Sequence, residues 1–375
     1  MRQVARRFGV GLFTVQRWVQ RARGQRLDRV DWSDRPHRAQ PPANRVTREV
    51  EDMVMELRRE LKEQSALGDY GAQAIHRELR TRGVRNLPSV RTIGRVLQRH
   101  GAVDGRQRTR RPAPPRGWYL PRLTDAEVEL DSFDIVEGLV IRGGPEVEVL
   151  NVVSLHGGLV GSWPRIASFK AQDAVDALVE HWREFGLPMY AQFDNDTRFQ
   201  GAHQFEDTFG RVTRLCLNLG VIPVFAPPRE TGFQAAIESY NGRWEAKVWS
   251  RFEHASLEDL QRRSTQYVLA GRERSAVRIE SAPGRRRFPR RWKLNLHARL
   301  KGQMVYLRRT TDNGRASLLG HSFEVAANWP HRLVRCQVDL DAHRIEFHAL
   351  RRRDPHRQPL LKTIAYRPQD KPFQG

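Results

Sequence analysis

Cysteine and long apolar runs are scarce in this 375-residue chain. Its two cysteines, Cys216 and Cys336, stand far apart, which excludes a disulfide framework and a cysteine-rich zinc site. No apolar run approaches the ~20 residues that span a bilayer, and the N-terminus lacks the apolar segment of a signal peptide. The sequence therefore predicts a soluble protein of a reducing compartment, with no membrane partner.

Acidic residues are outnumbered by basic ones. The chain has 65 Lys and Arg against 43 Asp and Glu, a formal net charge of +22. Such an excess is typical of proteins that bind nucleic acid, because each neutralised phosphate releases a counterion. A merely arginine-rich protein is the alternative. Because 39% of the residues are hydrophobic, the chain can fill packed cores, and its length predicts two or three domains.

Residues 1–23 carry the pattern of a helix-turn-helix. Gly9 lies between two short apolar-periodic stretches, whose apolar positions are Val4, Phe8, Val10, Val15 and Trp18. The second helix would present polar and basic side chains to DNA, namely Thr14, Gln16, Arg17 and Arg21. A plain helical hairpin is the alternative. The chain begins inside the motif, which we interpret as a truncated element or a mis-assigned start.

A second helical domain is expected over residues 47–100. Apolar residues recur there at helical spacing, and Ser89 is placed to cap the last helix. The pattern resembles another helix-turn-helix, with three outward-facing side chains: Arg91, Thr92 and Arg95. Residues 24–46 and 101–123 read as linkers. The second of these is basic and proline-rich, and either follows a phosphate backbone or is a solvated spacer.

Residues 124–275 predict an α/β layer fold. The expected order is three strands, helix, strand, helix, strand, helix, over 129–138, 146–155, 159–169, 171–186, 189–193, 211–220, 221–227 and 233–252. This order predicts a mixed sheet with helices on both faces. Residues 276–300 form a strongly basic linker. The short alternating strands of residues 301–375 predict a small antiparallel β-barrel.

Acidic side chains occur on three of these core elements. Asp131 and Asp134 lie on the first strand, and Asp194 directly follows the strand at 189–193. Glu238 lies on the helix at 233–252. Phosphodiester chemistry uses two hard cations held by such carboxylates from different elements. Taken singly, Asp194 could be a turn residue and Glu238 a solvated helical residue.

The acidic pattern resembles the DDE integrase-core transposases of bacterial insertion sequences, which are similar to retroviral integrases. The shared features are an Asp on the first strand, the QFDND run at 192–196, and the PPRE…IESYN run at 227–241. The resemblance implies an RNase H-like core and a carboxylate triad of Asp134, Asp194 and Glu238, with Asp131 as the alternative first member. Asp131 and Asp134 are three residues apart, so on a regular strand they point to opposite faces.

The resemblance also implies the function. Mg²⁺ or Mn²⁺, as two ions, would be held by Asp134, Asp194 and Glu238, and the enzyme would cleave 3′ ends and transfer them to target DNA. Its partners would be double-stranded DNA, at the element's terminal inverted repeats and at the target, and further copies of itself, as a dimer or higher. Arg243 and Lys247 would grip DNA, with a solvated basic face as the alternative. Asn195 and Asn241 would orient neighbouring groups, with a structural turn or cap role as the alternative.

Other functions stay open at this point. A catalytically inactive, domesticated DNA-binding regulator of the same fold is the main alternative. A nuclease of this fold would not need two helix-turn-helix arms. A Ser- or Tyr-nucleophile recombinase would need an Arg/His/Tyr set that the sequence does not offer at suitable spacing. The expected location is the bacterial cytoplasm, in association with the nucleoid.

Overall fold

The computed structural model describes residues 1–33, 46–103, 116–202, 204–230, 232–352, 354–369 and 373. Of the predicted linkers at 24–46 and 101–123, residues 34–45 and 104–115 lie outside these residues. None of the helices in the described ranges combines the length and apolar character needed to cross a bilayer.

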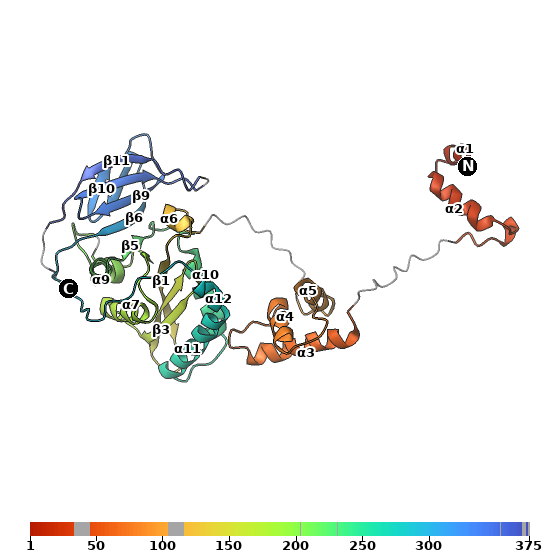
Figure 1. Ribbon diagram of the computed structural model, residues 1–375, viewed down its shortest axis with the longest axis horizontal. Helices are drawn as coiled ribbons and strands as arrows, with labels where there is room; N and C mark the ends of the chain where they lie inside the picture. The colour runs from red at the N-terminus through yellow and green to blue at the C-terminus, as the bar shows by residue number, and fades with distance from the viewer. Residues whose placement is uncertain are drawn as a thin grey trace.

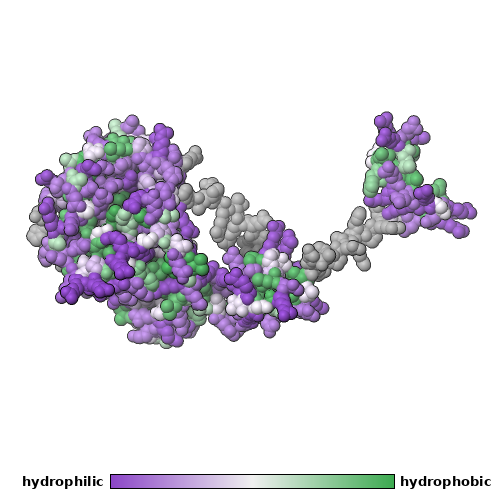
Figure 2. All heavy atoms as spheres, viewed as in Figure 1, coloured by the Kyte–Doolittle hydropathy of each residue, from purple (hydrophilic) through white to green (hydrophobic). Residues whose placement is uncertain are grey.

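Two short helices, α1 (Arg2–Arg7) and α2 (Leu12–Ala22), begin the chain, and a 3₁₀ turn, η1 (Leu27–Arg29), follows them. Gly9 joins the helices with φ +63°, a conformation that favours glycine. The predicted apolar face is only partly buried, because Val15 is covered whereas Phe8 is 67% exposed. Figures 1 and 2 show this unit drawn apart from the other elements, with apolar side chains on its surface.

Three helices form the second helical domain: α3 (Arg48–Gln64), α4 (Ala72–Thr81) and α5 (Val90–Arg99). They enclose a small core whose fully covered members are Val54, Leu57, Ile75, Leu79, Ile93, Val96 and Leu97. The predicted cap is present, because Ser89 Oγ accepts the backbone N–H of Thr92 at 3.2 Å. The apolar spacing of the sequence therefore located these helices correctly.

A nine-stranded mixed sheet is the centre of the molecule, in the order β11-β10-β9-β6-β5-β4-β1-β2-β3. Its first five strands along the chain are β1 (Leu130–Val140), β2 (Glu146–Ser154), β3 (Val160–Ile166), β4 (Tyr190–Phe193) and β5 (Ile222–Phe225). β1, β4 and β5 run parallel, whereas β2 and β3 pair antiparallel beside β1. The predicted mixed sheet is confirmed.

Helices cover both faces of this sheet (Figure 1). On one face lie α7 (Ala171–Phe185), α8 (Thr197–Gln200) and α9 (Arg211–Leu219); on the other lie α10 (Ala235–Trp244), the π-helical turn η2 (Glu245–Trp249), α11 (Leu257–Arg274) and α12 (Ala276–Glu280). Separate apolar clusters fill the two layers. The short helix α6 (Pro121–Thr124) packs near the ends of the central strands with a third cluster.

The C-terminal strands are β6 (Gln303–Arg309), β7 (Arg315–Leu318), β8 (His321–Glu324), β9 (Leu333–Asp339), β10 (Arg344–Ala349) and β11 (Leu360–Ala365). A separate small barrel at 301–375 is not confirmed. β6 pairs in parallel with β5, so four of these strands extend the central sheet, while β7 and β8 form a two-stranded sheet. Apolar side chains of both regions share one core, which explains why they do not separate.

The basic segment at 276–300 is anchored to the core. Arg285 donates two hydrogen bonds to the buried carboxylate of Asp131, at 2.5 and 3.0 Å, and Arg286 donates to the carbonyls of Leu219 and Gly220 at the end of α9. Burial by itself would raise the pKa of Asp131, but the Arg285 charge holds it well below its usual range. The segment is thus part of the packed structure.

Replacing Arg285 by Ala should leave Asp131 as a buried carboxylate without its cation. We expect the free energy of unfolding to fall by about 3–5 kcal/mol, measured by chemical denaturation near neutral pH. The neighbouring Arg287 is exposed, so Arg287→Ala should change stability by less than about 0.5 kcal/mol. Equal effects of the two substitutions would contradict the assigned role of the Asp131–Arg285 pair.

Candidate active site

Two of the predicted carboxylates lie side by side on neighbouring central strands of the sheet. β1 and β4 pair in parallel, and Phe133 of β1 stacks on Phe193 of β4 with ring centroids 5.5 Å apart. Asp134 and Asp194 are the next residues along the two segments. Because in-register residues of neighbouring parallel strands point the same way, the two carboxylates emerge side by side.

Glu238 approaches this pair of carboxylates from α10. The helix lies on β1 and β2 because Ile237, Tyr240 and Trp244 form its buried face. Glu238 lies beside that face and is exposed. Its charge acts on Asp134, so all three predicted carboxylates share one electrostatic environment.

The site has an excess of negative charge. Burial, followed by the charges of Asp194 and Glu238, raises the pKa of Asp134 to about 7. Burial also raises the pKa of Asp194, although the backbone N–H of Asp196 donates to its Oδ1 at 3.0 Å and acts in the opposite direction. A cation between these carboxylates would relieve both the burial cost and the repulsion.

A chain of amide and hydroxyl groups fixes the carboxylate of Asp134. Asn241, on α10, donates to Asp134 Oδ2 at 2.7 Å, and Asn151 on β2 donates to Asn241 Oδ1 at 2.9 Å. Ser162 on β3 donates to Asn151 Oδ1 at 2.6 Å and contacts the hydroxyl of Tyr240 at 3.0 Å. The chain links Asp134 to three other elements, so α10 and the sheet position it together.

The loop after β4 is held separately. Asn195 donates to the Ala226 carbonyl at 2.6 Å, which ties this loop to the end of β5. Asp196 caps α8 by accepting the backbone N–H of Arg198 at 2.7 Å. Arg198 in turn forms ion pairs with Asp196, Glu137 and Glu148. The sequence pattern indicates Asn195 and Asn241 but gives no signal for Arg198, Asn151 and Ser162, which carry no motif of their own.

Asp131 lies on the other face of β1. It accepts hydrogen bonds from Trp182 of α7 at 3.1 Å and from Arg285, and His181 Nε2 lies 3.5 Å away. The odd spacing between Asp131 and Asp134 explains this separation, because alternate residues of a strand face opposite sides. The structure therefore places Asp134, and not Asp131, next to Asp194.

The donor set agrees in kind with a hard divalent cation, because its members are carboxylate oxygens. Among the described residues, however, no group of three or more His, Cys, Asp or Glu side chains is close enough together to hold a metal ion. Asp134 and Asp194 are the paired part of the site. Glu238, at an exposed helical position, acts on Asp134 through its charge.

The predicted DNA-contacting residues of the two helical units differ in exposure. Gln16 and Arg17 on α2 are exposed, whereas Thr14 and Arg21 are half-buried. On α5, Arg91 and Arg95 are exposed and four residues apart, so they share one face. Thr92 is half-buried, and its hydroxyl lies 2.9 Å from Ser89 Oγ. Thr92 thus belongs to the cap of α5.

The two basic residues predicted near the carboxylates also differ. Arg243 on α10 is exposed, and its Nε donates to the Ser239 carbonyl of the same helix at 3.0 Å. Lys247 on η2 donates to the Gly68 carbonyl at 2.8 Å, so its ammonium group is engaged by the second helical domain.

Replacing Asp134 by Asn should stabilise the metal-free protein at alkaline pH. A carboxyl whose pKa is about 7 when folded and near 4 when unfolded lowers stability as the pH rises from 4 to 7. In EDTA at pH 8 we expect Asp134→Asn to raise the free energy of unfolding by about 2–4 kcal/mol, and the gain to shrink toward pH 4. The exposed Asp52→Asn should show no such trend; a pH-independent gain would count against the assigned cause.

Replacing Asn241 by Ala should leave Asp134 Oδ2 and Asn151 Nδ2 without their partners. We expect the free energy of unfolding to fall by about 1–3 kcal/mol, measured by denaturation with urea. Ser239→Ala is a suitable control on an exposed position of the same helix. An Asn241→Ala protein as stable as this control would show that the chain of hydrogen bonds does not hold α10.

A family model described as a homeodomain-like domain matches residues 14–97. The match runs from α2 to α5, so the predicted helix-turn-helix character of the N-terminal part is confirmed. No match was found among curated proteins.

Three solved integrase structures are similar to parts of the chain. The catalytic core domain of BIV integrase is 14% identical, with a TM-score of 0.28, over 38% of this chain and 81% of that chain. The HTLV-2 integrase catalytic core domain in complex with magnesium is 12% identical, with a TM-score of 0.27, over 44% and 88%. A simian T-cell lymphotropic virus intasome in complex with PP2A regulatory subunit B56 gamma is 12% identical, with a TM-score of 0.33, over 71% and 84%. At these scores the likeness carries no functional argument. The functional argument rests instead on the geometry of the site.

Proposed function

We propose that this chain is an integrase-type recombinase, a transposase that binds the ends of a DNA element, cleaves them and transfers the new 3′ ends to target DNA. The observation that carries the proposal is the pairing of Asp134 and Asp194 on neighbouring central strands, with the charge of Glu238 acting on the same site. The homeodomain-like match over residues 14–97 supports DNA binding.

The order of the core strands supports an RNase H-like fold. Three antiparallel strands are followed by two parallel strands added on the far side of β1, giving the order β3-β2-β1-β4-β5. This arrangement agrees with the integrase core inferred from the sequence. Asp134 lies within β1 and Asp194 directly follows β4, at the centre of the sheet.

Asp134, Asp194 and Glu238 would hold Mg²⁺ or Mn²⁺, as two ions. When bound, the ions supply activation of a water or hydroxyl nucleophile and stabilisation of the leaving oxygen. Asn241 keeps one oxygen of Asp134 occupied by a hydrogen bond, which leaves the other for coordination. Arg198 balances the neighbouring acidic residues without pairing with Asp134.

DNA recognition would be divided between the helical units. Arg91 and Arg95 on the exposed face of α5, with Gln16 and Arg17 on α2, suit base edges and phosphates in a major groove. Because two element ends must be joined, we propose that the protein works as a dimer or larger assembly on DNA. A bacterial insertion sequence is the proposed source of those ends.

Asp194→Asn should abolish metal-dependent cleavage and strand transfer. We expect a loss of roughly a thousandfold, the scale seen when one member of a concerted catalytic set is removed. The substrate is a labelled duplex carrying the inverted repeats that flank the reading frame, incubated with Mg²⁺ or Mn²⁺ and resolved on a denaturing gel. Asp52→Asn, on the exposed side of α3, should retain full activity.

DNA binding by the same variants separates the two leading functions. If wild-type protein binds the repeats but never cuts them, the chain is a regulator that retains the fold. Cutting that survives Asp194→Asn would disprove the carboxylate assignment, and failure of every variant to bind duplex DNA would disprove the recombinase.

A further inference from the structure

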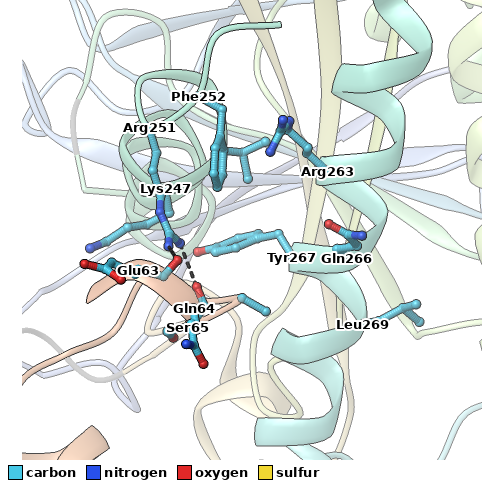
Figure 3. Close-up of a pocket in the computed structure, with 12 residues that line it drawn as sticks. Glu63, Gln64, Ser65, Lys247, Arg251, Phe252, Arg263, Gln266, Tyr267 and Leu269 are labelled. Atoms are coloured by element: carbon cyan, nitrogen blue, oxygen red, sulfur yellow. Dashed lines mark hydrogen bonds between the residues drawn. The ribbon is translucent and has the colours of Figure 1, made fainter. Parts of the chain in front are cut away.

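The corner between α3 and α4, residues 65–70, lies against the end of the helix that carries Glu238. We call these residues the α3–α4 corner. Figure 3 shows the contact, with α3 and its last residues facing Lys247 and Arg251 on one side and Tyr267 of α11 on the other. The corner is therefore where the second helical domain touches the catalytic domain.

Main-chain carbonyls make most of the polar contacts. Arg251 donates to Ser65 at 2.6 Å, to Glu63 at 3.0 Å and to Lys62 at 3.2 Å, and Lys247 donates to Gly68 at 2.8 Å. These carbonyls lie at and just beyond the C-terminus of α3, where helical carbonyls have no intrahelical partner and carry partial negative charge. The two cations satisfy them.

The α3–α4 corner also fits closely against Lys247 and α11. Gly68 has φ +59°, and a Cβ added there would lie 2.9 Å from Lys247 Cδ, so a side chain would collide with Lys247. Leu67 packs against the apolar cluster formed by α10, α11 and the first strands. Asp69 forms an ion pair with Arg274 of α11.

Lys247 and Arg251, which contact the α3–α4 corner, belong to a longer row of basic residues. Arg243, Lys247 and Arg251 lie after Glu238 and are spaced four residues apart from one another, and we call them the cation row. In the described part of the chain, none of the three forms an ion pair with a carboxylate; their hydrogen bonds go to carbonyls. A phosphate oxygen bears a full charge, so it is a stronger acceptor for these donors than a carbonyl.

We propose that the α3–α4 corner is an internal occupant of a phosphate-binding surface made by the cation row, and that a polyanionic phosphate backbone displaces it. The inference rests on the proposed function only in taking duplex DNA as the natural source of this phosphate backbone. Displacement frees the helical domain from the catalytic domain and releases the end of the helix that bears Glu238. The contact thus couples DNA binding to the freedom of the helix that carries Glu238.

The separation of the two domains can be measured by fluorescence resonance energy transfer between two dyes attached to the full-length protein. Dyes are attached to cysteines introduced by Thr81→Cys at the end of α4 and by Thr265→Cys on α11. Both positions are exposed, and both native cysteines are buried. We expect transfer to fall when a 30-base-pair duplex (about 100 Å long) is titrated in. Inorganic polyphosphate serves as the second probe, because it has the charge of the backbone without bases.

Variants test whether the corner competes with DNA. Leu67→Asp removes the apolar contact of the corner without touching the core of the helical domain. We expect it to lower transfer without DNA and to tighten duplex binding by roughly threefold to tenfold, since a larger fraction of the protein is then competent to bind. Met53→Asp adds the same negative charge at another exposed site of that domain and should not tighten binding.

The outcomes separate this inference from the proposed function. Duplex binding with unchanged transfer, or equal affinities of Leu67→Asp and Met53→Asp, would overturn the inference and leave the recombinase standing. Opening by polyphosphate but not by DNA would support the displaced corner and count against the recombinase. If Leu67→Asp does not fold by circular dichroism, Asp69→Arg, which opposes Arg274, is compared with Asp52→Arg, which makes the same change of charge away from the corner.

Discussion

The parallel pairing of β1 with β4 is the contact on which the site depends. It is held by apolar packing within one cluster, with Phe133 stacked on Phe193 and Phe193 next to Phe225 of β5. Asp134 follows Phe133 within β1, and Asp194 follows Phe193 just past the end of β4. The carboxylates are therefore carried by a rigid apolar layer, and their separation is set by the spacing of strands.

Charge is distributed unevenly over the protein. The chain has a large positive excess, yet the site formed by Asp134 and Asp194 has no cation paired with either carboxylate in the described residues, and burial and repulsion raise both pKa values. The stability lost at this site is balanced elsewhere by packing and by paired carboxylates such as Asp131. Carboxylates whose pKa values are raised in this way are typical of functional sites.

The helix that carries Glu238 connects the carboxylates to the rest of the protein. Its buried face fixes it on the sheet, Asn241 links it to Asp134, and its far end meets the second helical domain through Lys247 and Arg251. This helix and the segment that continues it thus connect the candidate site, the cation row and the second helical domain. A change at one end has a direct structural route to the other.

Local patterns in the sequence determined the helices of the second domain, the Ser89 cap, the order of the core elements and the three acidic candidates, because spacing and capping act over a few residues. Only the tertiary structure decided between Asp131 and Asp134, since that choice depends on which helices cover each face of β1. It also joined the C-terminal strands to the central sheet through the β5–β6 pairing, and brought Lys247 to Gly68 across 179 residues. Such contacts depend on packing between segments distant in the chain, and no short-range pattern encodes them.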